Sequence, residues 1–319
     1  MHDSDRQKTI LAILGPTASG KSALAFSIAK EINAEIISAD SRQIYRELNI
    51  GTAKPSQETL RQIKHHFVNE LSIGDPFTAG NFAREASARI RNILHSGKNV
   101  LIAGGSTLYL EALLNGFADL PPADTEKRQQ LAIELETFGS KHLFERLRQL
   151  DPLQAATLDH TKTQRLVRSL EIIELSGHTV TEMQKKHIQP LADINVITCG
   201  LSLPRPLLYE KINRRTDQML ASGLLQEAVA LFTKYYPYCD VITTNALQTV
   251  GYQELFAYLD EKTDFKTAIT LIKQHTRNYA KRQLTFFKNR LNVNWMDAPE
   301  NEHELSMLTT SCCRMITGN

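Results

Sequence analysis

A phosphate-binding pattern lies near the N-terminus. It follows the spacing G-x-x-x-x-G-K-S/T, in which glycines allow a tight loop whose backbone N–H groups point inward at an anionic phosphate chain. The lysine adds a point charge, and the serine opens a helix whose N-terminus favours negative charge and whose hydroxyl can coordinate Mg²⁺. An apolar run precedes the loop and an amphipathic helical pattern follows it, which is the context that this motif requires. The pattern comprises Gly15, Pro16, Thr17, Ala18, Ser19, Gly20, Lys21 and Ser22.

A carboxylate ends the next apolar run, because Asp40 follows residues 36–39 directly. The carboxyl ends of parallel strands meet at the ligand-binding edge of an open sheet, so we expect Asp40 beside the phosphate loop. There it could accept a proton from an incoming nucleophile or hold Mg²⁺. The alternative is an aspartate that caps a helix or a turn before Ser41.

The strand expected at residues 100–105 does not end in an acid. P-loop proteins that hydrolyse nucleotides normally hold Mg²⁺ with an aspartate at the end of such a strand, whereas this run ends in Gly104 and Gly105. The sequence therefore argues against a motor or switch protein. From the residues alone, a small-molecule kinase fits nearly as well as any other P-loop enzyme.

Two groups of basic and polar residues follow in the second half of the chain. Arg214 and Arg215 could neutralise a leaving phosphate or diphosphate, although surface arginines are common. Gln164, Arg165 and Arg168 form a polar face suited to nucleic acid. For this second group, a salt-bridged helix face is an equal alternative.

A basic helical segment spans residues 265–293. It contains seven Lys or Arg residues and no Asp or Glu, which favours contact with RNA or phosphate over a merely solvated helix face. Its stripe at i, i+4 and i+8 consists of Lys273, Arg277 and Lys281.

Strands and helices alternate early in the chain. Apolar runs at residues 9–14, 36–39 and 100–103 are separated by helical patterns, which is typical of a doubly wound parallel sheet. Residues 120–189 are polar and helical without a clear strand, and strand character returns at residues 195–201. We therefore expect an α/β fold, a P-loop NTPase-like parallel sheet flanked by helices, with a helical insertion domain. The expected domains are a catalytic core of residues 1–116 and 194–293 that includes the basic C-terminal helices, a helical insertion of residues 117–193, and a tail of residues 294–319 without an assigned role.

The composition is that of a globular protein, with 42% hydrophobic and 23% charged residues. No apolar run approaches the roughly 18 to 20 residues of a membrane span, and the polar start MHDSDRQKT lacks a signal-peptide core. We expect a cytoplasmic protein without a membrane partner, and a monomer by default. Lys and Arg number 37 against 35 Asp and Glu, so a nucleic-acid surface must come from local clustering. No C-x-x-C spacing, and hence neither a zinc site nor a disulfide framework, is found among Cys199, Cys239, Cys312 and Cys313.

Eight segments together closely resemble the tRNA dimethylallyltransferase family, also called tRNA isopentenyltransferases. The match runs in order from about residue 10 to residue 289, and its DSRQ, IGTAKP and YAKRQ stretches are far more specific than the phosphate loop. The segments are GPTASGKS (15–22), ISADSRQIYRELNIGTAKPS (37–56), AGGSTLYLEALL (103–114), LPPAD (120–124), QRLVRSLEI (164–172), INRRTDQMLASGLLQE (212–227), VGYQE (250–254) and TRNYAKRQLTFF (276–287).

The resemblance implies transfer of a dimethylallyl group from dimethylallyl diphosphate to the exocyclic amine of the adenosine just 3′ of the anticodon, with release of diphosphate. Thr17, Lys21 and Ser22 would hold diphosphate and Mg²⁺, Arg215 would stabilise departing negative charge, and Asp40 would take the amine proton. A loop that binds a leaving diphosphate needs no machinery for a hydrolytic water. The ATP-binding label that homologues commonly carry follows from the loop pattern.

The same resemblance implies a tRNA-binding surface. The adenosine would be flipped out and contacted beside Asp40, as in other enzymes that must reach one atom of a stacked base, and the insertion would grip the anticodon stem-loop. The implied contacts are Asp40, Ser41, Arg42, Gln43, Ser106, Arg128, Gln164, Arg165, Leu166, Val167, Arg168, Gln248, Thr249, Val250, Gly251, Tyr252 and Gln253, to which the basic segment adds Lys273, Arg277, Lys281 and Arg282.

The chain departs from the family pattern locally. Phe286 and Lys288 replace the usual Trp and Arg, Ser106 stands where Thr is common, and residues 158–163 lack the usual Asp before QR. These changes bear on tRNA contacts and leave the diphosphate site and Asp40 intact. The rival functions are a P-loop kinase that ignores tRNA and a non-catalytic RNA-binding P-loop protein.

Overall fold

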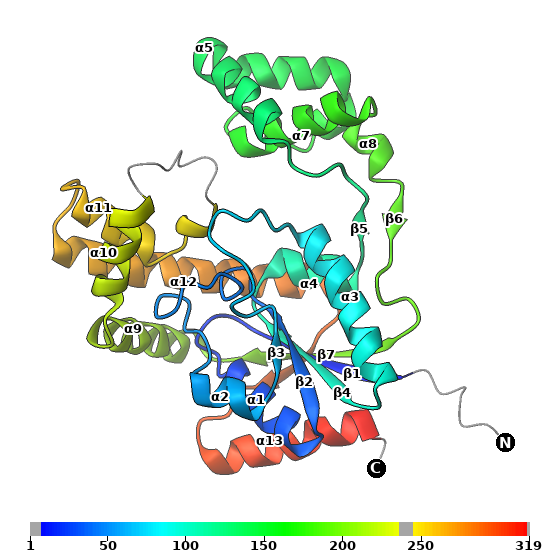
Figure 1. Ribbon diagram of the computed structural model, residues 1–319, viewed down its shortest axis with the longest axis vertical. Coiled ribbons are helices and arrows are strands. Elements are labelled where there is room, and N and C mark those ends of the chain that lie inside the picture. Colours follow the sequence, from blue (N-terminus) through cyan, green and yellow to red (C-terminus); the bar gives the residue numbers. More distant parts are fainter. Residues whose placement is uncertain (1–7, 236–244, 318–319) are drawn as a thin grey trace. The chain divides into compact units, whose positions relative to one another are not determined.

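A computed structural model describes residues 8–235 and 245–317 (Figure 1). The chain divides into two compact units. One comprises Met1–Asn115 with Pro190–Asn319, and the other comprises Gly116–Gln189.

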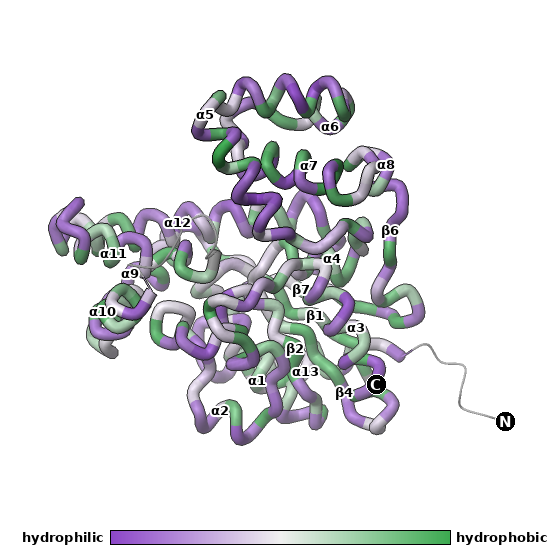
Figure 2. Tube along the Cα trace, turned by 45° about the horizontal axis from the view of Figure 1, so that its top comes forward, coloured by the Kyte–Doolittle hydropathy of each residue, from purple (hydrophilic) through white to green (hydrophobic). Residues whose placement is uncertain are grey.

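The larger unit contains a six-stranded parallel sheet with the strand order β3-β2-β4-β1-β7-β8. Its central strands are apolar and buried on both faces, as parallel sheets covered by helices require, and Figure 2 colours them as hydrophobic. The expected P-loop-type α/β fold is thereby confirmed. The strands are β1 (Thr9–Leu14), β2 (Ala34–Ala39), β3 (His65–His66), β4 (Asn99–Gly104), β7 (Asn195–Ser202) and β8 (Asn294–Asp297).

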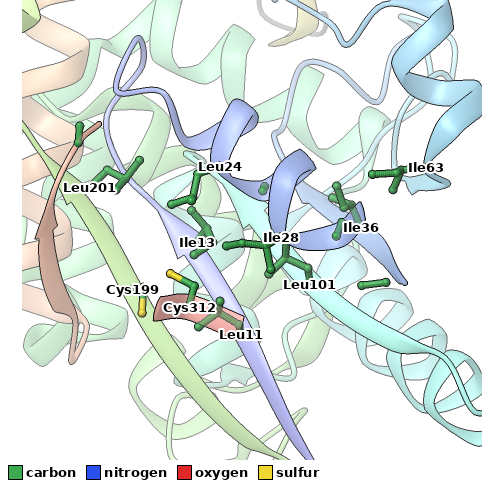
Figure 3. Close-up of a cluster of buried hydrophobic side chains, with 14 residues drawn as sticks. Leu11, Ile13, Leu24, Ile28, Ile36, Ile63, Leu101, Cys199, Leu201 and Cys312 are labelled. Atoms are coloured by element: carbon green, nitrogen blue, oxygen red, sulfur yellow. The ribbon is translucent and has the colours of Figure 1, made fainter. Parts of the chain in front are cut away.

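Helices cover both faces of this sheet (Figure 1). Alternate residues of each strand point to opposite faces, so Leu11 and Ile13 of β1 pack against α1 and the C-terminal helix α13, in a core that Figure 3 shows together with Cys199 and Cys312. The helices of this unit are α1 (Lys21–Glu31), α2 (Gln57–Gln62), α3 (Ala79–His95), α4 (Thr107–Leu114), α9 (Arg205–Ala221), α10 (Leu224–Tyr235), the 3₁₀ turn η2 (Asn245–Leu247), α11 (Tyr252–Leu259), α12 (Phe265–Arg290) and α13 (Glu302–Thr317).

The segment of residues 294–319, to which the sequence assigned no role, contains parts of the larger unit. β8 pairs with β7 in the sheet, and α13 packs against α1. The strand β8 was not expected from the sequence, because four residues are too few to produce a readable alternation of polar and apolar side chains.

The smaller unit has a core of its own, formed by residues such as Leu131, Leu143 and Leu170. A short antiparallel ladder pairs its first strand with its last. The expectation of no strand within residues 120–189 is therefore wrong at His187–Ile188. The long helix contains a kink at Gly139, whose φ of 79° is left-handed. The elements are β5 (Phe117–Ala118), α5 (Thr125–Leu150), α6 (Pro152–Ala155), α7 (Thr163–Ser176), α8 (Val180–Met183) and β6 (His187–Ile188).

Among the described residues, none of the helices is both long and apolar enough to cross a membrane. Cys199, Cys312 and Cys313 are free thiols, and Cys239 lies outside the described residues. Within residues 8–235 and 245–317, no group of three or more His, Cys, Asp or Glu side chains could hold a metal ion.

Candidate active site

The phosphate loop connects β1 to α1 through left-handed backbone. Gly20, the N-cap residue of α1, has a φ of 89°, and Ala18 has a φ of 63°. A Cβ at Gly15 would lie 2.8 Å from the Ser19 hydroxyl oxygen and 3.2 Å from the carbonyl oxygen of Leu201. The first turn of α1 contains no acidic side chain that would repel an anion, so its backbone N–H groups can bind one. The Ser19 hydroxyl is buried without a hydrogen-bond partner among the described residues, which leaves bonding capacity in the loop unused.

Two cations lie at this loop. Lys21 Nζ donates to the carbonyl oxygen of Pro16 at 3.3 Å, and Arg215 Nη1, from α9, donates to Thr17 Oγ1 at 3.2 Å. The pKa of Lys21 is lowered to about 8, chiefly by burial and secondly by the charge of Arg215. Burial also lowers the pKa of Arg215, against the opposing effect of Asp40. Two desolvated cations that repel each other form a site for an anion with more than one negative charge.

Asp40 lies directly after β2, and its side chain is half-buried. Its Oδ1 accepts the backbone N–H groups of Arg42 at 2.8 Å and Gln43 at 3.2 Å. Oδ1 therefore caps the turn that follows Asp40, as the alternative interpretation of the sequence predicted. Oδ2 accepts no hydrogen bond within residues 8–235 and 245–317. The charge of Asp40 partly offsets the effect of burial on the pKa of both Lys21 and Arg215, so the carboxylate acts electrostatically on both cations.

A glutamine that the sequence did not single out joins the phosphate loop to the end of β4. Gln283, on α12, is buried, its Oε1 accepts the N–H of Thr17 at 2.9 Å, and its Nε2 donates to the carbonyl oxygen of Gly105 at 2.6 Å. The N–H groups of Gly105 and of the buried Ser106 both donate to the carbonyl oxygen of Ala39. The ends of β2 and β4 therefore meet beside the loop.

Tyr279 is a second site residue that the sequence did not single out. The pKa of Tyr279 is raised to about 12, chiefly by burial and secondly by the charge of Asp40, whereas a hydrogen bond with Gln283 acts in the opposite direction. The side chain is 37% exposed, so part of it faces solvent beside Asp40. Tyr279 and Gln283 begin and end the YAKRQ stretch of the resemblance, which was the available signal, and their spacing of four residues puts both on one face of α12.

The predicted adenosine contacts after Asp40 lie in a compact loop. Ser41 and Arg42 are half-buried. Gln43 uses its side-chain amide within the loop, because Nε2 donates to the carbonyl oxygens of Thr52 at 3.1 Å and Ala53 at 3.2 Å. Gln43 thus shapes the loop, and its contact with tRNA stays a prediction.

The basic stripe on α12 takes part in helix packing. Lys273 Nζ pairs with Asp217 at 2.6 Å, and Arg277 Nη1 donates to Asn213 Oδ1 at 2.8 Å, where both partners belong to α9. These two side chains are therefore committed to neighbours within the unit. The predicted contacts of this helix that are exposed are Lys281 and Arg282.

In the smaller unit, two predicted tRNA contacts bind a buried acid. Arg128 and Arg168 pair with Glu171 at 3.1 and 2.7 Å, and Glu171 is 0% exposed. Both arginines therefore form salt bridges within the unit, which for Arg168 is the alternative that the sequence left open. Leu166 is fully buried in the core of the unit, so we do not propose a tRNA contact for its side chain. Val167 is half-buried, and the exposed predicted contacts are Gln164 and Arg165.

The predicted tRNA contacts around the start of α11 also include both buried and accessible residues. Tyr252 is fully buried and Gly251 is buried, so neither offers a side chain to a partner. A tRNA contact of these two residues stays a prediction, and sequence patterns do not reveal that the ring of Tyr252 fills the core. Gln253 is exposed, and the half-buried residues are Gln248, Thr249 and Val250.

These features define a P-loop α/β protein whose anion site carries two cations that interact electrostatically with the carboxylate of Asp40. The sequence model described as "IPP transferase" matches residues 43–290. A tRNA dimethylallyltransferase of Chlorobium limicola is 60% identical over 314 residues, which cover 98% of this chain and 99% of that protein.

Solved structures agree with this relationship. A tRNA delta(2)-isopentenylpyrophosphate transferase from Staphylococcus epidermidis is similar with a TM-score of 0.69 and 31% identity, over 98% of this chain and 99% of that one. A eukaryotic dimethylallyltransferase acting on tRNA gives a TM-score of 0.78 at 25% identity, over 98% of this chain and 80% of that one. The chain belongs to the IPP transferase family of tRNA-modifying prenyltransferases, and the resemblance found in the sequence is confirmed.

Proposed function

We propose that the protein transfers the dimethylallyl group of dimethylallyl diphosphate to the exocyclic amine of the adenosine 3′-adjacent to the anticodon in tRNA. The observation that carries this proposal is that the charge of Asp40, at the end of β2, acts on both Lys21 and Arg215, the two desolvated cations at the phosphate loop. A diphosphate matches the two positive charges, and the carboxylate offers a proton acceptor where the nucleophile must enter.

The reaction breaks the allylic C–O bond and forms a C–N bond. Negative charge grows on the diphosphate as the allyl group becomes positive, so Lys21 and Arg215 stabilise the transition state more than the bound substrate. The electron pair of the broken bond leaves with the diphosphate. The amine nitrogen supplies the new bond, and its proton passes to Asp40. Thr17 holds the Arg215 guanidinium in place through the hydrogen bond between them.

The residues at the start of α1 fit a magnesium ion that is bound mainly through the substrate. The Ser22 side chain is exposed in the first helical turn, and Mg²⁺ is commonly held by few protein ligands together with phosphate oxygens and water. We infer that Ser22 and the diphosphate would share it. When bound, Mg²⁺ would neutralise part of the charge on the leaving group.

The tRNA contacts that we propose are the exposed members of the predicted set together with Ser41, Arg42 and Gln43 in the loop after Asp40. The basic side chains would contact phosphates, which position the RNA without reading its sequence, and the loop after Asp40 would receive the flipped adenosine. We assign recognition of the anticodon stem-loop to the insertion of residues 117–193. The exposed basic members are Arg165, Lys281 and Arg282.

The test is nucleoside mass spectrometry of tRNA that lacks prenyl groups. The purified protein is incubated with this tRNA, Mg²⁺ and dimethylallyl diphosphate, without ATP. We expect one dimethylallyl group on adenosine in the wild type, and a loss of roughly a hundredfold or more in turnover with retained tRNA binding in Asp40→Ala. Unmodified tRNA beside an active control enzyme would favour the kinase, and undiminished turnover in Asp40→Ala would remove its role as the base.

A further inference from the structure

The loop after Asp40 is held by one carboxylate from a distant helix. Glu227, on α10, accepts the N–H groups of three consecutive residues, because its Oε2 accepts those of Asn49 at 3.2 Å and Ile50 at 2.9 Å, and its Oε1 accepts that of Gly51 at 3.1 Å. The hydroxyl of Tyr252 also donates to Oε1. A single side chain thus satisfies four donors, and hydrogen bonds to a charged acceptor are the stronger kind.

The residues around Glu227 are packed so closely that Gly51 cannot be replaced by a residue with a side chain. A Cβ at Gly51 would lie 2.5 Å from the ring of Tyr252, so only glycine permits this approach of loop and ring. Burial raises the pKa of Tyr252 and the charge of Glu227 raises it further. The hydroxyl therefore remains a donor to Glu227 throughout the physiological pH range.

The opposite side of the loop is braced by a lysine. Lys54 Nζ donates to the carbonyl oxygen of Tyr45 at 2.7 Å, to Asn49 Oδ1 at 3.0 Å and to Asn69 Oδ1 at 2.6 Å. Asn49 thus receives Lys54 at its side chain and donates its backbone N–H to Glu227. The backbone of residues 49–51 is fixed from two directions.

Gln43 connects this fixed segment to Asp40. Its Nε2 donates to the carbonyl oxygens of Thr52 and Ala53, which follow the residues held by Glu227. Its backbone N–H donates to Asp40 Oδ1 at 3.2 Å. A continuous set of hydrogen bonds and short backbone links therefore runs from Glu227 to the carboxylate of Asp40.

We propose that Glu227 is a positioning residue for Asp40, which it acts on through residues 49–53 and Gln43. By holding Oδ1 of Asp40 in its turn, this arrangement keeps Oδ2 directed for removal of the amine proton. The inference rests on the proposed role of Asp40 as the base. A general base must lie within hydrogen-bond reach of its proton, so a small displacement of the carboxylate reduces turnover.

The test uses the full chain with the substitution Glu227→Gln, which keeps the size of the side chain. It replaces one carboxylate oxygen by an NH₂ group, which cannot accept a hydrogen bond from the backbone N–H groups of residues 49–51. The measurements are single-turnover rates of dimethylallyl transfer, the KM for dimethylallyl diphosphate and the Kd for inorganic diphosphate by calorimetry. We expect the transfer rate to fall about tenfold to a hundredfold. The Kd for diphosphate and the KM for dimethylallyl diphosphate should not change, because the phosphate loop has separate contacts.

A second set of variants separates positioning from general loss of structure. Gln226→Ala, on the exposed side of the same helix, is the matched control and should keep the wild-type rate. In an Asp40→Asn background, Glu227→Gln should lower the residual transfer rate no further, since residues that act through one another are not additive. Should Glu227→Gln fail to fold, Tyr252→Phe removes one of the four donors and keeps the ring, and a rate reduction of a few-fold is expected.

Three outcomes would overturn the inference. They are an unchanged rate in Glu227→Gln, a parallel loss of diphosphate affinity, and an equal fractional loss in the wild-type and Asp40→Asn backgrounds. Failure of the proposed function can be distinguished from failure of this inference. It would show as absence of transfer by the wild type or as undiminished transfer by Asp40→Ala.

Discussion

Arg215 is a half-buried, desolvated cation whose hydrogen-bond acceptor is a hydroxyl rather than a carboxylate. Its guanidinium donates to Thr17 and forms no ion pair within residues 8–235 and 245–317. Burying an unpaired charge is costly unless a partner compensates for it. The site therefore gains most when a negatively charged ligand arrives, and more still when that ligand acquires charge during the reaction.

Replacement of this side chain should separate catalysis from RNA binding. In Arg215→Ala we expect kcat to fall about a hundredfold to a thousandfold, as for loss of one group that stabilises developing charge, with little change in the Kd for tRNA. Steady-state kinetics and filter binding measure the two quantities. The control is Arg214→Ala, since Arg214 is 59% exposed and its contact with Glu210 is a long 3.9 Å. A larger loss of tRNA binding than of kcat would make Arg215 a binding residue.

Lys21 makes binding of diphosphate depend on pH. Its pKa of about 8 lies below the ordinary 10.5, so the amine is charged and binds the anion below pH 8 and loses its proton as the pH rises through 8. We expect the affinity for inorganic diphosphate to fall above pH 8, by at most about tenfold per pH unit. Calorimetry from pH 7 to about 9.5 measures this change.

Lys21→Arg is the control for this prediction, because a guanidinium keeps its charge over the whole range. Any pH dependence that remains in Lys21→Arg belongs to ionisation of diphosphate itself. If wild type and Lys21→Arg follow the same curve, the lowered pKa of Lys21 does not govern binding.

At the scale of elements, α12 completes the phosphate loop from outside the sheet. Gln283→Leu would leave the N–H of Thr17 and the carbonyl oxygen of Gly105 without their partner. A buried polar group that loses its partner costs about 1 to 3 kcal/mol, so we expect a lower free energy of unfolding by urea denaturation together with weaker diphosphate binding. Gln274→Leu makes the same change at an exposed position of α12 and should alter neither. Equal effects of both substitutions would refute this role.

The elements that the sequence predicts are those with a long enough pattern. The central strands β1, β2, β4 and β7 were recognisable as apolar runs, and the glycine and lysine spacing placed the phosphate loop. β3 has two residues and β8 has four, too few for any periodicity. The contacts of Gln283 and Glu227 join residues about 180 to 270 positions apart. Local patterns cannot reveal such pairs, because only the folded backbone brings them together.

At the scale of the whole molecule, the insertion leaves and rejoins the chain at adjacent points. β5 and β6 pair in antiparallel register, with Phe117 opposite Ile188 and Ala118 opposite His187. The insertion also has its own hydrophobic core. A unit with this construction can be removed with little effect on the backbone elsewhere, because its two ends already lie side by side.

Removal of the insertion should therefore leave the diphosphate site and weaken tRNA binding. In the altered chain, an Asn-Gly turn replaces residues 119–186 and joins Ala118 to His187, since two-residue loops of this type fit antiparallel strands. We expect the Kd for inorganic diphosphate to remain within about twofold, and the affinity for tRNA to fall at least about tenfold with a shallower salt dependence. Calorimetry and filter binding at several salt concentrations measure both.

The full chain with Gln164→Ala and Arg165→Ala is the matched control for this deletion, since both side chains are exposed on α7. It should lose only part of the tRNA affinity, because phosphate contacts contribute individually. Undiminished tRNA binding by the shortened chain would assign recognition to the larger unit alone. Loss of diphosphate binding would instead mean that the larger unit needs the insertion for its own fold.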